Sequence, residues 1–383
     1  MKTINALRGT VDRRESREAG WKRAGRLLEM ALAQLETAVA QLTGAMGLML
    51  LLTVGLPAAG QPADGLKTKG SQEGTANRTE VLMAEGGGRE EGEQIRIVFW
   101  NVENFFDYKD GGTGESDTEF SAHGERRWTR KRFLAKCRAI AKALLWIADG
   151  YGGLADIVGL AEVENGFVLQ NLLSQTALRR CGYAVVHFDS PDPRGIDVAL
   201  LYRRERLRLV EARPLPVEGL QTRDILQCGF VGRGGDSLAV LVCHLPSKYG
   251  GAGTASRRVV ALQRLKAAAD SLRGAGWSRM VLTGDFNEEA SDPLFDVMEP
   301  DYENLGRNCR QGSIRFDGSW QLIDNAFVPS GAFTGVRFAP VRIPFLIARD
   351  SAHAGEKPFR TYSGPQYIGG VSDHLPVYIL LKR

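Results

Sequence analysis

From residue 95 to residue 381 the chain repeats one pattern, in which a short apolar run begins or ends at polar residues. Such a run is typical of a strand that is buried on both faces. The runs interpreted as strands are 95–100, 156–163, 183–188, 197–203, 237–245, 279–286, 322–328 and 376–381, and helical periodicity is found at 131–148, 166–180 and 254–273. Many strands with a few long helices predict a layered α/β protein.

Residues 1–60 differ from this pattern. They hold eight basic and five acidic residues, yet the stretch 37–63 has no charge and contains the apolar run AMGLMLLLTVGL. An apolar run that ends in small residues is typical of a secretory signal, and about 20 apolar residues can also span a bilayer. We therefore expect residues 1–60 to be an export signal or a membrane anchor. A soluble helix is the alternative, which the glycines of the run and Pro57 disfavour.

Residues 61–93 are rich in Gly, Glu, Thr and Ser and contain few large apolar residues. This composition predicts a flexible linker, followed by one domain over residues 94–383. Outside residues 1–60 the charges nearly cancel, with 41 basic and 40 acidic residues. A protein that binds a polyanion non-specifically usually has a basic excess, so the charge gives no support for strong non-specific DNA binding.

Reactive side chains gather at the ends of the predicted strands. Sites in open α/β sheets form there, because the strands are a rigid scaffold and the loops are free to vary. The residues placed in this way are Asn101, Glu103, Glu162, Asp197, His244, Asp285, Asn287, Asp324, Asp373 and His374. Their number is hard to explain by solubility alone, so we interpret them as one functional site.

The residue types suit phosphate chemistry. A hard cation such as Mg²⁺ takes oxygen ligands, and Glu162 is the main candidate, with Asn101 or Glu103 beside it. Displacement at phosphorus also needs an oriented water and proton transfer, for which a histidine held by a carboxylate is well suited. His374 and His244 are the two candidates.

Seven segments occur in an order that resembles one known family. They are FWNVENFF, GLAEVEN, GIDVALLYR, CHLPS, LTGDFNE, LIDNAFV and SDHLPVY. The order is similar to that of the endonuclease/exonuclease/phosphatase superfamily, which includes pancreatic-type deoxyribonuclease, abasic-site endonucleases, bacterial sphingomyelinases and inositol polyphosphate 5-phosphatases. The resemblance implies a four-layered α/β sandwich, in which two mixed β-sheets pack face to face with helices outside.

The resemblance also implies roles for the matching residues. Those on the metal side are Glu162, Asn101, Asp373 and, less directly, Glu103, and the catalytic residues are His244, Asp285, Asn287, Asp324, His374 and Asp197. Asp324 is expected to orient His374, and Asp197 to orient His244. His244 stands where abasic-site endonucleases carry a tyrosine, which argues against abasic-site repair.

Four further segments, GERRW, TRD, SKYGG and PFRTY, resemble an exported bacterial subgroup. They supply Arg127, Arg223, Lys248 and Arg360 as candidate phosphate contacts, since guanidinium groups bind phosphate with two hydrogen bonds. A surface or structural role is the alternative for each. The acidic segment 107–120 lacks the spacing of a calcium loop, and we expect it to be exposed to solvent.

Together these patterns predict an exported phosphoesterase that attacks a P–O bond with an activated water. The expected cofactor is Mg²⁺, with Mn²⁺ or Ca²⁺ as alternatives. The leading substrate class is a nucleic acid phosphodiester. Alternatives are a phosphomonoester or a lipid or inositol phosphate, and a catalytically dead binding domain is least favoured. We expect a monomer, which is tethered to a membrane if the N-terminal anchor is retained.

Overall fold

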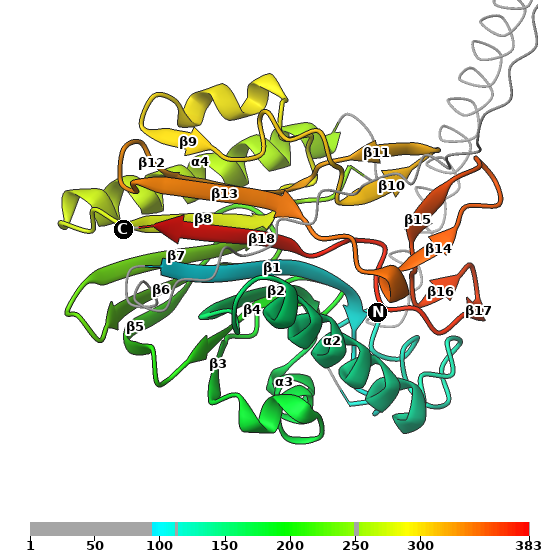
Figure 1. Cartoon of the computed structure of the whole chain (residues 1–383). Coiled ribbons are helices and arrows are strands. Elements are labelled where there is room, and N and C mark those ends of the chain that lie inside the picture. Colours follow the sequence, from blue (N-terminus) through cyan, green and yellow to red (C-terminus); the bar gives the residue numbers. More distant parts are fainter. Residues whose placement is uncertain (1–93, 112–113, 249–252, 383) are drawn as a thin grey trace, which may run out of the picture. The chain divides into compact units, whose positions relative to one another are not determined.

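The computed structural model describes residues 94–111, 114–248 and 253–382 (Figure 1). The predicted export signal, 1–60, and the predicted linker, 61–93, lie outside the described residues. Among the helices that are described, none combines the length and the apolar character needed to cross a membrane.

Two six-stranded sheets form the centre of the domain. The first has the strand order β13-β18-β1-β2-β4-β3, and the second has the order β5-β6-β7-β8-β12-β9. The first sheet comprises β1 (Gln94–Phe105), β2 (Ile157–Val163), β3 (Tyr183–His187), β4 (Asp197–Arg203), β13 (Gly335–Pro340) and β18 (Val377–Lys382). The second comprises β5 (Leu207–Leu215), β6 (Ile225–Gly232), β7 (Ser237–His244), β8 (Met280–Asp285), β9 (Tyr302–Asn304) and β12 (Asp324–Pro329). Both sheets are mixed, because β1 and β2, and likewise β7 and β8, run parallel among antiparallel neighbours.

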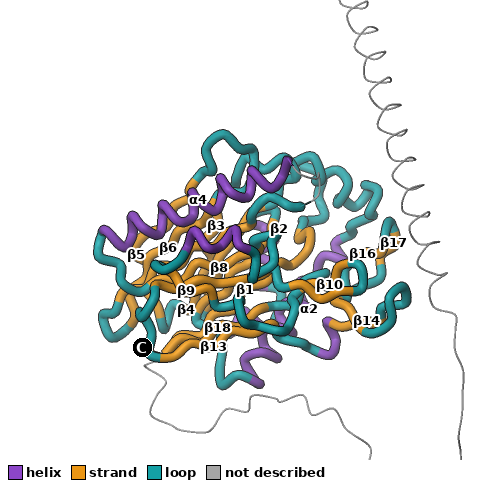
Figure 2. Tube along the Cα trace, turned by 90° about the horizontal axis from the view of Figure 1, so that it is seen from above, coloured by secondary structure: helices purple, strands orange, loops and turns teal. Residues whose placement is uncertain are grey.

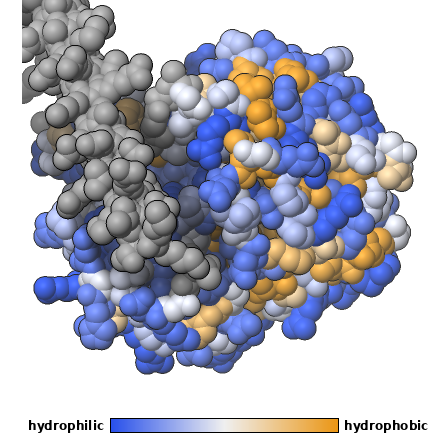
Figure 3. Space-filling model, turned by 180° about the vertical axis from the view of Figure 1, so that it is seen from behind, coloured by the Kyte–Doolittle hydropathy of each residue, from blue (hydrophilic) through white to orange (hydrophobic). Residues whose placement is uncertain are grey.

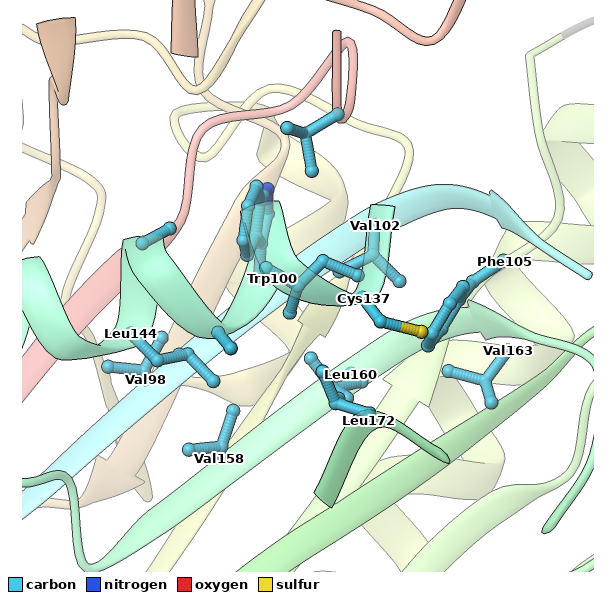
Figure 4. Packing of buried hydrophobic residues seen from close by; sticks show 14 of the residues in the cluster. Val98, Trp100, Val102, Phe105, Cys137, Leu144, Val158, Leu160, Val163 and Leu172 are labelled. Carbon is cyan, nitrogen blue, oxygen red and sulfur yellow. The ribbon is translucent and has the colours of Figure 1, made fainter. Parts of the chain in front are cut away.

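Helices cover the outer face of each sheet, α2 (Arg130–Gly150) and α3 (Gly166–Ser174) on one side and α4 (Gly253–Gly274) on the other (Figures 1 and 2). Three apolar cores separate the four layers: one between the sheets, one between the first sheet and α2 with α3 (Figure 4), and one between the second sheet and α4. The predicted four-layered α/β sandwich is therefore confirmed.

The first outer core shows why α2 forms where it does. Thr129 caps the helix by accepting a hydrogen bond from the Arg132 backbone N–H at 3.5 Å. Phe133, Cys137 and Leu144 follow at helical spacing and are buried against the first sheet. The predicted helix 166–180 is shorter than expected, because α3 ends at Ser174 and a separate 3₁₀ turn follows over Ala177–Arg180.

Three small hairpins lie beyond one end of the sandwich (Figures 1 and 2). They are β10 (Ile314–Phe316) with β11 (Ser319–Gln321), β14 (Ile347–Arg349) with β15 (Glu356–Pro358), and β16 (Tyr362–Ser363) with β17 (Gln366–Tyr367). The first hairpin is attached directly to the site residues, since Ile314 forms a β-bridge with His374. Two 3₁₀ turns, η3 (Pro293–Met298) and η4 (Pro344–Leu346), complete the described elements.

Hydrophobic and hydrophilic residues are mixed on the face seen from behind (Figure 3). The exposed large apolar side chains are Trp146, Phe188, Val210, Val259, Val260, Val297, Phe316 and Ile368, and apart from Val259 and Val260, which are both on α4, they belong to different parts of the chain. Apolar residues exposed singly are ordinary on protein surfaces, so we assign no binding role to them.

The acidic segment 107–120 is not solvated throughout, contrary to the prediction. Asp107 and Asp117 are buried, and both interact with Glu164, which follows β2. The Asp107 backbone N–H donates to the Glu164 carboxylate at 2.6 Å. Burial raises the pKa of Glu164 to about 8, and the Asp117 carboxyl adds to this effect, whereas the Asp107 hydrogen bond opposes it. The contacts of Asp107 and Asp117 with Glu164 thus hold this segment against the domain.

This pKa predicts how stability depends on pH. The pKa of Glu164 rises from 4.5 to about 8 on folding, so the folded protein binds this proton more tightly than the unfolded chain does. The stabilisation that this proton provides is therefore fully present below pH 4.5 and is lost as the pH rises through about 8. We expect Glu164→Gln to reduce the fall in melting temperature between about pH 5 and pH 8. The melting temperatures of the wild type and of Glu164→Gln, measured across this pH range, test this expectation. An equal fall in melting temperature for the two proteins would contradict the raised pKa of Glu164.

Candidate active site

The predicted site residues meet at the end of the sandwich that carries the hairpins. The carboxyl ends of β1, β2, β7 and β8 lie at this end together with the amino ends of β4, β12 and β18. Irregular backbone turns the side chains at β1 and β2 into the site, because the register shifts after Asn101 and after Ala161.

Four residues here have a positive φ without being glycine: Glu103 (49°), Asn104 (49°), Glu162 (61°) and Asn287 (50°). Each such residue costs about 1–3 kcal/mol and persists only where its surroundings fix it. In return, the backbone N–H groups of Glu103 and Asn104 donate to Asn101 Oδ1 at 2.9 Å and to the Glu162 carboxylate at 2.7 Å. The strained backbone therefore fixes the positions of the Asn101 and Glu162 side chains.

Asp285 lies at the centre and joins the two sheets. Its Oδ2 accepts a hydrogen bond from Asn101 Nδ2 at 2.9 Å, and it lies 3.5 Å from His244 Nε2 and 3.7 Å from His374 Nε2. Its Oδ1 accepts the Asn287 backbone N–H at 2.9 Å. Burial raises the pKa of Asp285 to about 7, although His374 opposes this. Asp285 is therefore able to exchange a proton near neutral pH.

His374 and Asp324 form the predicted pair. His374 Nδ1 lies 2.7 Å from Asp324 Oδ2, and both side chains are buried. The Trp100 indole N–H donates to the His374 carbonyl at 2.9 Å, and the His374 backbone N–H donates to Ser372 Oγ at 3.0 Å. Burial alone would lower the pKa of His374, but Asp324 and then Asp285 raise it well above its usual value. The imidazole is thus held as a cation.

His244 lies in the opposite electrostatic environment. Burial, then the Arg223 and Arg194 guanidinium groups, hold its pKa well below the usual value for histidine. Its Nδ1 has no hydrogen-bond partner among the residues that the structure describes. The site therefore combines one neutral and one cationic imidazole on either side of Asp285.

Asp197 does not orient His244, contrary to the prediction. One carboxylate oxygen accepts the Ser190 backbone N–H at 2.9 Å, and the other lies 3.1 Å from His187 Nε2. β3 and β4 pair with His187 opposite Ala199, so Asp197 is a diagonal neighbour of His187 on the same face of the sheet. We therefore remove Asp197 from the catalytic residues and assign it a structural role, in which it links β3 and β4.

The oxygen donors around Glu162 fit a hard divalent cation. The Glu162 side chain is largely buried, and burial alone would raise its pKa, but Arg194 and the Asn104 N–H lower it, so that the carboxylate is ionised. Asn101 Nδ2 lies 3.4 Å from Glu162 and bridges it to Asp285. Glu162 and Asn101 would hold the cation, with Asp373 on the adjacent segment.

Glu103 has contacts that differ from those of a simple metal ligand. Its Oε1 accepts Arg360 Nε at 3.1 Å, and its Oε2 accepts the Thr361 backbone N–H at 2.9 Å. Arg360 also lies 3.0 Å from Asp373, so the guanidinium bridges two of the predicted metal-side carboxylates. Burial, then Asp373, raises the pKa of Glu103 to about 7. Direct metal binding by Glu103 and Asp373 stays a prediction.

Among the described residues, two groups of side chains have atoms close enough to share a metal ion, namely Asp285, Asp324 and His374, and His187, Asp189 and Asp197. We interpret the first group as the proton-transfer centre, because the His374–Asp324 contact already occupies one ring nitrogen. Asp189 in the second group is largely exposed, and Asp197 is already bonded to Ser190 and His187.

The four predicted phosphate-binding cations have different surroundings. Arg360 is half-exposed beside the metal-side carboxylates, as described above. Arg223 is buried, and its terminal nitrogens donate to Asp192 at 2.9 Å and to the Leu245 carbonyl at 2.8 Å, so we correct its role to a structural one. Lys248 is half-exposed and pairs with Glu288, and Arg127 is exposed. For Lys248 and Arg127 phosphate binding stays a prediction.

Two cations of the site were not predicted. Arg194 donates to Asn104 Oδ1 at 2.7 Å and lies 3.5 Å from Glu162, with its side chain partly exposed. Lys136 is buried beneath the site and donates to the Glu103 carbonyl and to Thr361 Oγ1. One signal was available for Lys136, since a lysine on the apolar face of a helix needs a buried partner.

The comparisons agree with this geometry. A family model described as the endonuclease/exonuclease/phosphatase family matches residues 96–383. No curated protein matches the chain in sequence. Similar solved structures include a humanized D. rerio TDP2 with 14 mutations, at 14% identity, with 76% of this chain and 99% of that one covered and a TM-score of 0.50. Others are an endonuclease/exonuclease/phosphatase family protein from Bacteroides thetaiotaomicron (17%, 75% and 97%, 0.50) and the human Nocturnin catalytic domain with bound sulfate (18%, 76% and 93%, 0.50). At these identities the likeness concerns the fold.

The His374–Asp324 pair gives a direct test of the site. We expect His374→Ala to lower kcat for phosphate ester hydrolysis by at least about 10²-fold, since it removes the cationic imidazole beside Asp285. The matched control is His353→Ala, which removes a half-exposed histidine from the turn between β14 and β15 and should leave kcat unchanged. Steady-state rates give kcat for each protein, and circular dichroism spectra show whether each variant is folded. Near wild-type turnover of a folded His374→Ala protein would exclude His374 from the mechanism.

Proposed function

This chain belongs to the endonuclease/exonuclease/phosphatase family, and we propose that it hydrolyses phosphodiester bonds by attack of an activated water, as a nuclease-type enzyme. As a member of this family it is a phosphoesterase that depends on a divalent metal. The observation that carries the proposal is the placement of Asp285 between a neutral and a cationic imidazole, 3.5 Å from His244 and 3.7 Å from His374.

The residues of the site divide the chemistry between them. Asp285, whose pKa is about 7, accepts a proton from the attacking water. The cationic His374, oriented by Asp324, donates a hydrogen bond to a phosphoryl oxygen as negative charge develops there. As the bond from water to phosphorus forms, the P–O bond to the leaving group breaks, and the leaving oxygen takes up a proton from solvent. His244 Nε2 and the Asn287 backbone N–H lie next to the Asp285 carboxylate and help to fix its position.

A bound divalent cation supplies positive charge to the phosphoryl oxygens and lowers the pKa of a coordinated water. We propose Mg²⁺, because the donors of the Glu162 side are hard oxygen atoms, with Mn²⁺ or Ca²⁺ as alternatives. We also propose that Arg360 and Arg194 bind the phosphate group of a substrate, because both are partly exposed beside acidic residues of the site.

One alternative has support from a particular observation, and another is disfavoured. The near balance of charge outside residues 1–60 favours a substrate smaller than a long polyanion, which would be a phosphomonoester or a lipid or inositol phosphate. A catalytically dead binding domain is disfavoured, because the His374–Asp324 and Asn101–Asp285 contacts are both intact.

A hydrolysis panel tests the proposal. Plasmid DNA, RNA, sphingomyelin, inositol phosphates and p-nitrophenyl phosphate are incubated with the protein in Mg²⁺ and in EDTA, with His374→Ala as the inactive control. We expect hydrolysis of nucleic acid in Mg²⁺ and none in EDTA. Preference for a monoester or a lipid substrate would replace the nuclease assignment by the corresponding alternative. Hydrolysis that persists in EDTA would overturn the metal requirement.

We also propose that the protein is exported, on the order of its segments: charged residues, then the uncharged run 37–63, then the Gly- and Glu-rich stretch before the domain. Cell fractionation with N-terminal sequencing tests this. A mature protein that begins near Gln61 in the exported fraction supports cleavage, and intact chain in the membrane fraction supports a tether. Intact chain found only in the cytoplasm would overturn export.

A further inference from the structure

A lysine lies inside the domain beneath the site. Lys136 belongs to α2, is 2% exposed, and occupies the helix face that otherwise packs on the first sheet through Phe133 and Cys137. Its ammonium group donates to the Glu103 carbonyl and, at 2.9 Å, to Thr361 Oγ1. Both acceptors are neutral oxygens, and the Glu103, Glu162 and Asp373 carboxylates act on the ammonium group by charge from beyond ion-pair distance. A buried ammonium costs free energy unless it is hydrogen-bonded and near opposite charge.

The first contact holds the irregular end of β1. Glu103 and Asn104 both have a φ of 49°, and the carbonyl between them is the one that Lys136 binds. With this carbonyl turned toward α2, the Glu103 N–H reaches Asn101 at 2.9 Å and the Asn104 N–H reaches Glu162 at 2.7 Å. Lys136 therefore fixes, through the backbone, the position of the main metal-side carboxylate.

The second contact holds the segment that leads to His374. Thr361 donates its backbone N–H to Glu103 at 2.9 Å and its hydroxyl to the Val371 carbonyl at 3.0 Å. The preceding residue, Arg360, bridges Glu103 and Asp373. One ammonium group thus joins β1 and the 360–373 segment, which are far apart in the sequence and both carry residues of the predicted metal side.

We propose that Lys136 is a positioning residue, whose buried ammonium group clamps the Glu103 carbonyl to Thr361 and so holds Glu162 and Asp373 in one preformed arrangement. Its catalytic consequence rests on the proposed phosphoesterase function. The clamp itself does not, because it can be observed without any substrate.

The test compares Lys136→Met, which keeps the length of the side chain but removes both hydrogen bonds, with Lys136→Gln, which keeps an uncharged donor. The control is Lys131→Met, an exposed position on the same helix. Hydrogen exchange of the full-length protein is expected to become faster in residues 101–106 and 358–373 of Lys136→Met and to stay unchanged elsewhere in the domain. Lys136→Gln should fall between Lys136→Met and the wild type, and Lys131→Met should match the wild type.

Kinetics of the same proteins give the second readout. For the substrate that the wild type hydrolyses, we expect kcat of Lys136→Met to fall at least about tenfold with a smaller change in KM, because the misplaced groups act on the reacting atoms. Part of kcat should return in Lys136→Gln.

The clamp would be overturned if Lys136→Met showed wild-type hydrogen exchange in residues 101–106 and 358–373, or uniformly faster exchange throughout the domain. Should Lys136→Met fail to fold, Lys136→Gln decides by the same comparison. A wild type that is inactive on every substrate counts against the proposed function, and the exchange result still decides the clamp.

Discussion

The burial of several carboxylates at one end of the sandwich is the constraint on which the site depends. Glu103, Asp285 and Asp324 are each at most 4% exposed, and Glu162 lies beside them. Buried charges of one sign repel and lose hydration, so each needs donors or cations around it. The structure supplies His374, Arg360, Arg194 and the backbone N–H groups of an irregular strand end, and a bound divalent cation would add further positive charge to the same set.

The two histidines show how local charge assigns different roles to the same residue type. Burial disfavours the protonated form of both histidines, but His374 faces Asp324 and Asp285, which favour it, whereas His244 faces Arg223 and Arg194, which disfavour it further. Arg223, removed from the phosphate contacts because its terminal nitrogens are used internally, still acts on the site in this way. Pairs of titratable groups whose environments separate their pKa values are how one site provides both an acid and a base near neutral pH.

Much of this fold was predictable, because the central strands are buried on both faces and are therefore continuous apolar runs in the sequence, as in β2 and β7. The edge strands β5 and β13 were missed, because β5 alternates buried and exposed residues and carries charges, and β13 is only half-buried. The edge strand β3 was predicted, whereas β6 was missed although it is a buried, largely apolar strand inside the second sheet. In the site, residue type and place at a strand end identified Asp285, Asp324 and His374. The partner of Asp197 was predicted wrongly, since it depends on strand register, and Lys136 and Arg194 were missed, since their contacts join distant segments.

The pairing of β1 with β18 also has a kinetic consequence. Ile97 pairs with Ile379, so the middle of the first sheet joins segments almost 300 residues apart in the sequence. Contacts of such separation require closure of a very long loop before they contribute stability, which slows folding and favours partly folded intermediates. Asn101 lies on β1, and His374 lies shortly before β18, so these two residues come together only when the strands pair. Until β1 and β18 pair, the catalytic centre is therefore not assembled.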